Sequence, residues 1–497
     1  TFRGGKALAR YEFAAGLNAC LDKINEIIAT GLADKVSKED LATVQKLQEE
    51  YAAELATLRG RVDSLDKKVT TIESQQFSPT TKLSGLAFFN ITGATASAPV
   101  RAERSLATPD NINAVPTRGV GGVPSTSLRS NPNVTFGYYL FLTLTTSFTG
   151  KDSLVTQLVT GNGSSPANNF ASAGYTNSWG TPFLDQTGVP TANVFNIREL
   201  FYSFPVASNV NLAIGPRINF YRFFDQNRFT SFLTGATSFN SNGSTLSNAV
   251  DRGSGAVAVW TISPQFRLTA AYLGENTEFL NPATNPNFNT SSNPREGLFG
   301  GTNTLTAELV YSPSRDANIR FLYTRSNIRT NTAGFLSGAT AEPLPYGIAD
   351  DGQGRPIDNA TADTIILNFD WLISKNFGIF GRYSYGSTKI SPLTIGTPGG
   401  NINVNAFQFG MGFPDLFKEG ALGVLSFVVP YSYSSGRNFL VSGGGDGATQ
   451  YDLELSYYYP VTKNIAIVPA FYAIFNPNSF STNPTVFVGN LRTQFSF

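Results

Sequence analysis

The chain contains 497 residues with a formal net charge of +1; 41% of them are hydrophobic, 14% charged and 13% aromatic. This mixture is too polar for a bundle of membrane helices, and no apolar run approaches the roughly 20 residues that a spanning helix needs. A net charge near zero provides no bulk field to attract nucleic acid, so we expect no nucleic-acid partner.

Histidine is absent, and Cys20 is the single cysteine. Their scarcity excludes an intrachain disulfide, Ser-His-Asp and Cys-His catalysis, and metal sites built from His or Cys. We therefore expect no enzyme activity, no cofactor and no bound metal. The chain opens on Thr1 and its only methionine is Met411, so we expect that N-terminal sequence is missing from it.

Residues 1–36 contain a short helical pattern that Gly31 closes. Apolar residues recur there at spacings of three and four: Ala14, Leu17, Leu21, Ile24 and Ile28. Arg10 and Glu12 precede most of this stripe, and their plainest interpretation is a solvated ion pair on a helix face.

Residues 37–76 follow an unbroken heptad pattern, which predicts an α-helical coiled coil that begins near Lys38. Its core is formed by Leu41, Gln48, Leu55, Val62 and Val69 at a, and by Val44, Tyr51, Leu58, Leu65 and Ile72 at d. Polar Gln48 is expected to set register and oligomer number, and the other core residues permit two strands or three. The alternative is a single amphipathic helix that lies on the protein.

Pro79 ends the helical region, and residues 77–497 form a separate domain of strands, turns and loops. Short connections lie near residues 149–152, 205–209, 263–265, 313–317, 374–376, 414–420 and 461–464. Long connections rich in Gly, Asn, Ser and Pro lie at 93–133, 161–193, 219–253, 276–302, 326–360, 388–400, 435–449 and 477–483. This alternation predicts an all-β transmembrane barrel of about sixteen antiparallel strands, with both ends on the periplasmic side.

The last eight residues show the barrel pattern most clearly. Leu491, Phe495 and Phe497 fall on one face, whereas polar residues such as Arg492 fall on the other. A polar face opposite an apolar one fits a barrel with lipid outside and water inside, in the outer membrane. A sixteen-stranded barrel is too wide for side chains to fill, and no single segment is large enough to plug it, so we expect a wet lumen.

The third long loop, residues 219–253, is the expected pore constriction. It begins with a dense group of aromatic residues around Arg222, Asp225 and Arg228, which suggests a packed element. The alternative is a surface loop that packs on the barrel rim or on a neighbouring subunit.

Other charged residues are predicted to point into the lumen from their place in the alternation: Arg217, Arg267, Arg320, Arg382, Arg492, Glu308, Asp370, Asp452 and Glu454. If the two signs occupied opposite walls, a transverse field would set ion preference. Each arginine could equally belong to a structural ion pair. The segment around Arg198 and Glu199 mixes both faces, as a bulge or a subunit contact would.

Two short stretches, Ala9-Arg10-Tyr11-Glu12 and Ala14-Ala15-Gly16-Leu17-Asn18, resemble the end of a surface-layer-homology motif. With the heptads, the barrel and the terminal Phe497, the whole chain resembles the cyanobacterial major outer-membrane porins, whose barrel is of the carbohydrate-selective, OprB-like type. The resemblance implies a homotrimer, binding of a peptidoglycan-linked polysaccharide through Arg10 and Glu12, and recognition of Phe497 by the barrel-assembly machinery.

The resemblance further implies passive diffusion of inorganic ions and small hydrophilic solutes, with the N-terminal part in the periplasm. One alternative is a mainly structural role, in which the protein fastens the outer membrane to the cell wall. Another is a channel selective for carbohydrate or iron, although the residues offer no iron ligand set. An outer-membrane lipase or protease is disfavoured because histidine is absent.

Overall fold

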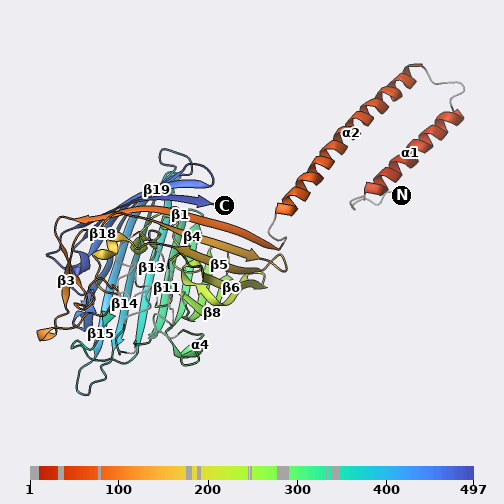
Figure 1. The fold of residues 1–497 in the computed structure, drawn as a ribbon. Coiled ribbons are helices and arrows are strands. Elements are labelled where there is room, and N and C mark those ends of the chain that lie inside the picture. The colour runs from red at the N-terminus through yellow and green to blue at the C-terminus, as the bar shows by residue number, and fades with distance from the viewer. Residues whose placement is uncertain are drawn as a thin grey trace. The chain divides into compact units, whose positions relative to one another are not determined.

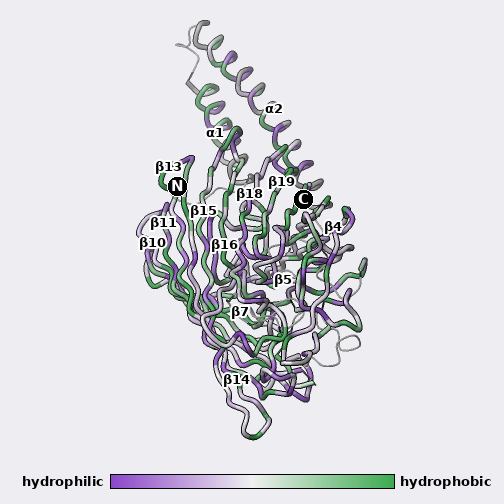
Figure 2. Tube along the Cα trace, turned by 90° about the vertical axis from the view of Figure 1, so that its left-hand side faces the viewer, coloured by the Kyte–Doolittle hydropathy of each residue, from purple (hydrophilic) through white to green (hydrophobic). Residues whose placement is uncertain are grey.

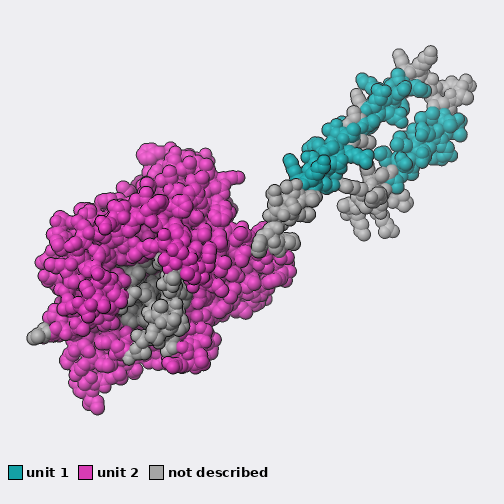
Figure 3. All heavy atoms as spheres, viewed as in Figure 1, with its two compact units in different colours: residues 1–79 teal, residues 80–497 magenta. Residues whose placement is uncertain are grey.

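The computed structural model describes residues 10–31, 38–75, 80–112, 114–174, 182–186, 192–244, 246, 249–276, 290–331, 333–336 and 348–497. The chain divides into two compact units, Thr1–Pro79 and Thr80–Phe497 (Figure 3). The division falls close to the boundary predicted from Pro79. The predicted boundary between residues 36 and 37 lies outside the described residues.

The first unit contains two helices, α1 (Arg10–Gly31) and α2 (Lys38–Gln75). Among the helices that the structure describes, none is both long and apolar enough to cross a membrane. The heptad core of α2 is uncovered in this single chain, since Leu41 is 57% and Leu65 59% exposed. The side chains of Leu55, Val69, Ile72, Arg10 and Glu12 lie outside the described residues.

In the second unit, sixteen described strands close into an antiparallel barrel (Figure 1), which confirms the predicted architecture. The barrel strands are β1 (Thr81–Ala96), β4 (Thr135–Thr146), β5 (Ser153–Gly161), β6 (Asn196–Ala207), β7 (Val210–Asn219), β8 (Arg252–Thr261), β9 (Phe266–Glu275), β10 (Asn303–Ser314), β11 (Ala317–Ile328), β13 (Ala360–Ser374), β14 (Phe377–Ile390), β15 (Gly400–Pro414), β16 (Leu422–Ser435), β18 (Tyr451–Pro460), β19 (Ile465–Phe475) and β20 (Val486–Ser496).

Short turns alternate with long loops around the described barrel, as predicted, so one end is tight and the other carries the long loops. Four short strands lie in the long loops, where β2 (Val100–Glu103) pairs with β3 (Thr126–Arg129) and β12 (Ile348–Ala349) pairs with β17 (Leu440–Ser442). The same loops contain α3 (Phe239–Asn242), α4 (Gly297–Gly300) and the 3-10 turns η1 (Val120–Gly122), η2 (Pro166–Asn169), η3 (Phe220–Arg222), η4 (Arg437–Phe439) and η5 (Pro477–Ser479).

The first and last strands close the barrel. Gly85 and Phe497 exchange backbone hydrogen bonds of 2.7 and 3.1 Å, which extends the ladder between β1 and β20 to the final residue. On β20, Leu491 is 45% exposed, whereas Arg492 is 2% exposed and faces inward. The predicted two-faced end of the chain is therefore confirmed, and Figure 2 shows the same mixing of hydrophobic and hydrophilic residues along the barrel strands.

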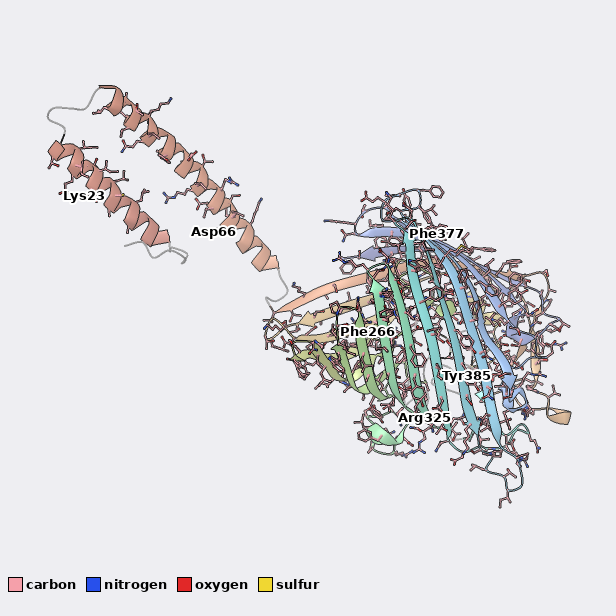
Figure 4. All side chains as sticks on the ribbon, turned by 180° about the vertical axis from the view of Figure 1, so that it is seen from behind. Lys23, Asp66, Phe266, Arg325, Phe377 and Tyr385 are labelled. Carbon is pink, nitrogen blue, oxygen red and sulfur yellow. The ribbon has the colours of Figure 1, made fainter. Side chains whose placement is uncertain are left out.

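Aromatic residues gather on the outer surface near the short-turn end. The rings of Phe266 and Tyr311 stack at 4.8 Å, and those of Phe377 and Phe413 lie 5.6 Å apart. Figure 4 labels Phe266 and Phe377 at the starts of their strands. Such a band of aromatic side chains is typical of the level at which a barrel meets the membrane interface.

The lumen is not wet throughout, contrary to expectation. At the long-loop end, inward side chains such as Ile402, Val404 and Val488 are fully buried. They pack against Phe170, Leu336 and other residues of the long loops in one apolar cluster, the mouth core. Several loops together thus fill part of the mouth, which the sequence pattern did not predict.

Candidate functional site

The third long loop, L3 (residues 220–251), folds into the barrel and contacts its inner wall. It begins with η3, which Asn219 caps by accepting a hydrogen bond from the Tyr221 N–H. Phe220 is fully buried and stacks on Phe224 at 4.8 Å. Three sets of contacts, described next, join the described residues of L3 to the inner wall.

The first anchor of L3 is Asp225, which adopts a left-handed backbone with φ of +52°. Its carboxylate accepts hydrogen bonds from Arg382 Nε at 2.9 Å and from Asn368 Nδ2 at 2.6 Å, and its N–H donates to Glu308 at 2.7 Å. The side chains of Arg382 and Asp225 are only 2% and 1% exposed. A buried, fully engaged ion pair of this kind fixes the loop at one geometry.

The second anchor is Phe229, a fully buried ring stacked on Phe380 at 5.6 Å. Gly378 and Gly412 make room for it, because a Cβ on either would lie 2.3 or 2.2 Å from the ring. Two glycines on adjacent strands thus form a slot that accepts one aromatic side chain from L3. Asn227 locks the neighbouring turn through a 2.8 Å bond to Asn368.

The third anchor lies on β18 and β20. Glu454 accepts hydrogen bonds from the backbone and hydroxyl groups of Thr237 and Ser238. Arg492 donates to the carbonyl groups of Phe232 and Leu233 at 2.9 and 3.1 Å. Asp452 accepts from Asn240 at 2.8 Å. L3 is consequently attached to the inner wall from β10 round to β20.

These contacts show whether the predicted inward charges face an open lumen or form structural contacts. Arg382, Glu308, Glu454 and Arg492 hold L3, as described above, and Asp370 accepts from Arg320 at 2.6 Å. The remaining predicted lumen residues occupy these places: Arg228 lies 3.6 Å from Asp370, and Arg267 pairs in register with the buried Val310 on the inner face. Arg320 and Arg382 thus form structural ion pairs with Asp370 and Asp225. Glu454 and Arg492 instead bind uncharged groups of L3. Structural contacts of both kinds therefore engage most of these charges.

The prediction for Arg217 is wrong. Arg217 pairs with Leu200, the neighbour of the buried, inward Phe201, and so belongs to the outer face. Its guanidinium donates to the Ile197 carbonyl. A register shift in β7 between Ile214 and Arg217 breaks the alternation on which the prediction relied.

A bulge in β6 places two charged residues that the site prediction omitted. Gln157 pairs with Glu199 and Leu158 with Ile197, so Arg198 is the residue that the bulge inserts. Arg198 and Glu199 are both buried, at 6% and 2% exposure, although they are consecutive. The mixed faces of this segment in the sequence indicate a bulge or a subunit contact, and the structure shows a bulge.

Both residues line a cavity of about 460 Å³ between L3 and the wall formed by β1 and β4 to β7. Most of its lining side chains are aromatic or polar, with two leucines and a glycine among them: Leu86, Phe141, Gln157, Phe183, Arg198, Glu199, Asn219, Tyr221, Arg222, Phe224, Asp225, Gln226, Asn227, Thr230, Ser231, Phe232, Leu233, Phe239, Asn242, Gly243 and Ser244. Of the residues predicted for the constriction, the structure thus brings Arg222 and Asp225 to this cavity.

The long loops also hold one another at the mouth. Arg118 forms two hydrogen bonds with Asp350, at 2.8 and 2.7 Å. Glu103 accepts from Ser172 at 3.1 Å and from the N–H groups of Gly443 and Gly445. Burial raises the pKa of the Glu103 carboxyl to about 7, although these donors oppose the shift.

A closed barrel of sixteen described strands, with a third loop against its inner wall and an internal cavity, is the architecture of outer-membrane porins. This chain belongs to the OprB family of carbohydrate-selective porins, whose family model matches residues 38–497.

Its relatives include two uncharacterized cyanobacterial proteins. One, from Nostoc sp. (strain PCC 7120), is 31% identical over 100% of this chain and 79% of the relative. The other, from Synechocystis sp. (strain PCC 6803), is 28% identical over 100% of this chain and 84% of the relative. Among solved structures, OprB of Pseudomonas putida at high pH has a TM-score of 0.55 and 12% identity over 84% of this chain and 94% of that one, which shows a shared fold.

Proposed function

We propose that this protein is a passive diffusion channel through which small hydrophilic solutes and inorganic ions cross the outer membrane down their gradients. Support comes above all from the cavity between L3 and the wall of β1 and β4 to β7. A barrel of this width conducts unless it is filled. The anchors of L3 hold that loop against the wall opposite the cavity, on β14 and β18.

The lining of the cavity supports sugars among the solutes. Flat aromatic rings such as Phe183, Phe232 and Phe239 lie beside amide and hydroxyl groups from Asn227 and Ser231. Rings offer apolar faces to a sugar, and polar groups orient its hydroxyls. The family description as carbohydrate-selective points the same way. The described residues give no comparable support to iron uptake.

Purified protein in planar bilayers and in liposomes tests this function. We expect stepwise conductance under a salt gradient and swelling of liposomes driven by neutral sugars. Arg222→Ala changes a cavity residue, and Arg325→Ala, on the outer surface, is its matched control. Folded protein that neither conducts nor admits sugars would overturn the channel and leave the structural role.

We also propose that the N-terminal part fastens the barrel to the cell wall in the periplasm, as a homotrimer joined by the α2 heptads. The exposure of Leu41, Leu58 and Leu65 favours a helical partner for α2, because an a/d seam left in water is costly. A second and third copy of the same helix fit it best.

Deletion of residues 1–76 tests the attachment. We expect loss of cosedimentation with peptidoglycan and unchanged single-channel conductance. Arg10→Ala should weaken sedimentation, whereas Lys23→Ala, on the exposed face of α1, should leave it intact. Retained attachment in the deletion variant would refute the tether. The role of Phe497 in recognition by the assembly machinery is tested by in-cell folding yield after Phe497→Ala.

A further inference from the structure

An ion pair between the barrel wall and L3 lies within the lining of the cavity. Glu199 on β6 accepts hydrogen bonds from Arg222 Nη2 at 2.6 Å and Nε at 2.9 Å, and its other oxygen accepts from Asn219 at 2.9 Å. The Arg222 guanidinium also lies over the Phe201 ring, 5.5 Å from its centre. These contacts hold both charges in place while a solute passes.

The two partners are unequally exposed. The Arg222 side chain is 39% exposed, whereas that of Glu199 is 3% exposed. The Arg222 guanidinium is therefore the partner that the cavity reaches, and the Glu199 carboxylate is shielded from it. The anchor pair Arg382–Asp225 differs, because both of its side chains are almost fully buried.

We propose that the Arg222–Glu199 pair determines the ion preference of this channel: Arg222 attracts the anionic groups of passing ions and solutes, and Glu199 limits that attraction through its opposite charge. This inference rests on the proposed channel function. A fixed charge at the wall of a narrow, water-filled passage changes the local concentration of ions of both signs. Glu199 pairs with Gln157 and lies on the inner face with Phe201, and the β6 bulge places Arg198 beside it on the same face.

Reversal potentials under a potassium chloride gradient test the pair. Glu199→Gln should raise the ratio of anion to cation permeability by about two- to fivefold, and Arg222→Gln should lower it by a similar factor. The double variant should return close to the unaltered protein. Arg222→Lys, which keeps the charge, should leave the reversal potential nearly unchanged.

An ion pair on the outer surface supplies matched controls. Arg325 and Asp363 pair across β11 and β13, with side chains 43% and 42% exposed, and Figure 4 labels Arg325 on this surface. Asp363→Asn and Arg325→Gln make the same charge changes away from the cavity and should not shift the reversal potential.

The outcomes distinguish a failure of the proposed channel function from a failure of the proposed role of the Arg222–Glu199 pair. Absence of conductance in the unaltered, folded protein contradicts the channel function itself. Normal conductance with unshifted reversal potentials in both Glu199→Gln and Arg222→Gln overturns the role of the pair. If Glu199→Gln does not fold, Arg222→Gln still decides, because Arg222 is the more exposed partner.

Discussion

Replacement of Phe229 by alanine should release the middle of L3 from the wall. The ring is 1% exposed, stacks on Phe380, and fills the slot left by Gly378 and Gly412. Phe→Ala changes in well-packed interiors cost about 3–5 kcal/mol, and the glycines cannot close the gap because their strands are fixed in the barrel. A loss of this size exceeds the net contribution of about 1 kcal/mol from a typical single hydrogen bond nearby.

The barrel itself should remain folded, because its ladders do not involve Phe229. We expect faster proteolysis within L3 in detergent, together with larger or noisier single-channel conductance. Phe407→Ala, on the outer face of β15 where the ring is 47% exposed, is the matched control. Gly412→Ala should reproduce the effect, because its methyl group would lie 2.2 Å from the Phe229 ring.

One result would refute this reasoning. If Phe229→Ala leaves both the protection of L3 and the conductance unchanged, the remaining polar contacts hold the loop without the ring. An equal effect of Phe407→Ala would mean that any loss of aromatic area disturbs the barrel.

Three further predictions concern the closure of the barrel between β1 and β20, the anchoring of L3 and the packing of the loops at the barrel mouth. Gly85→Val should lower the thermal stability of the folded barrel on semi-native gels, because a Cβ there would lie 2.2 Å from the Phe497 ring; Gly489→Val, where the space is open, is the control. Arg382→Met should cost L3 about 3–5 kcal/mol, measured by hydrogen exchange, because a buried carboxylate loses its partner; an unchanged exchange rate would contradict it. Burial raises the pKa of Glu103 from 4.5 to about 7, so the protonated carboxyl should stabilise the mouth fully below pH 4.5. About 3 kcal/mol of that stability should be lost as the pH rises through 7. Glu103→Gln should flatten the pH dependence of loop proteolysis, and a pH dependence that persists in this variant would refute the assignment to Glu103.

The sequence by itself determined the barrel. Strand alternation and the spacing of turns are local properties, so they predicted about sixteen strands, the short and long ends, and the inward face of β20. The density of aromatic and charged residues after Asn219 also predicted a packed element there, but it left open whether that element lies in the lumen or on the rim.

Only the tertiary structure decided what the inward charges do. Glu308, Arg382 and Glu454 each follow the alternation, but their partners on L3 are distant in sequence and no local pattern encodes the pairing. The bulges in β6 and β7 are equally hidden from the sequence pattern. Each inserts one residue into its strand, which places Arg198 beside Glu199 on the inner face and moves Arg217 to the outer face. The mouth core likewise exists only because loops far apart in the chain meet there. Alternation predicts which face a residue occupies, but the contacts across the lumen determine whether its charge binds a loop or meets a solute.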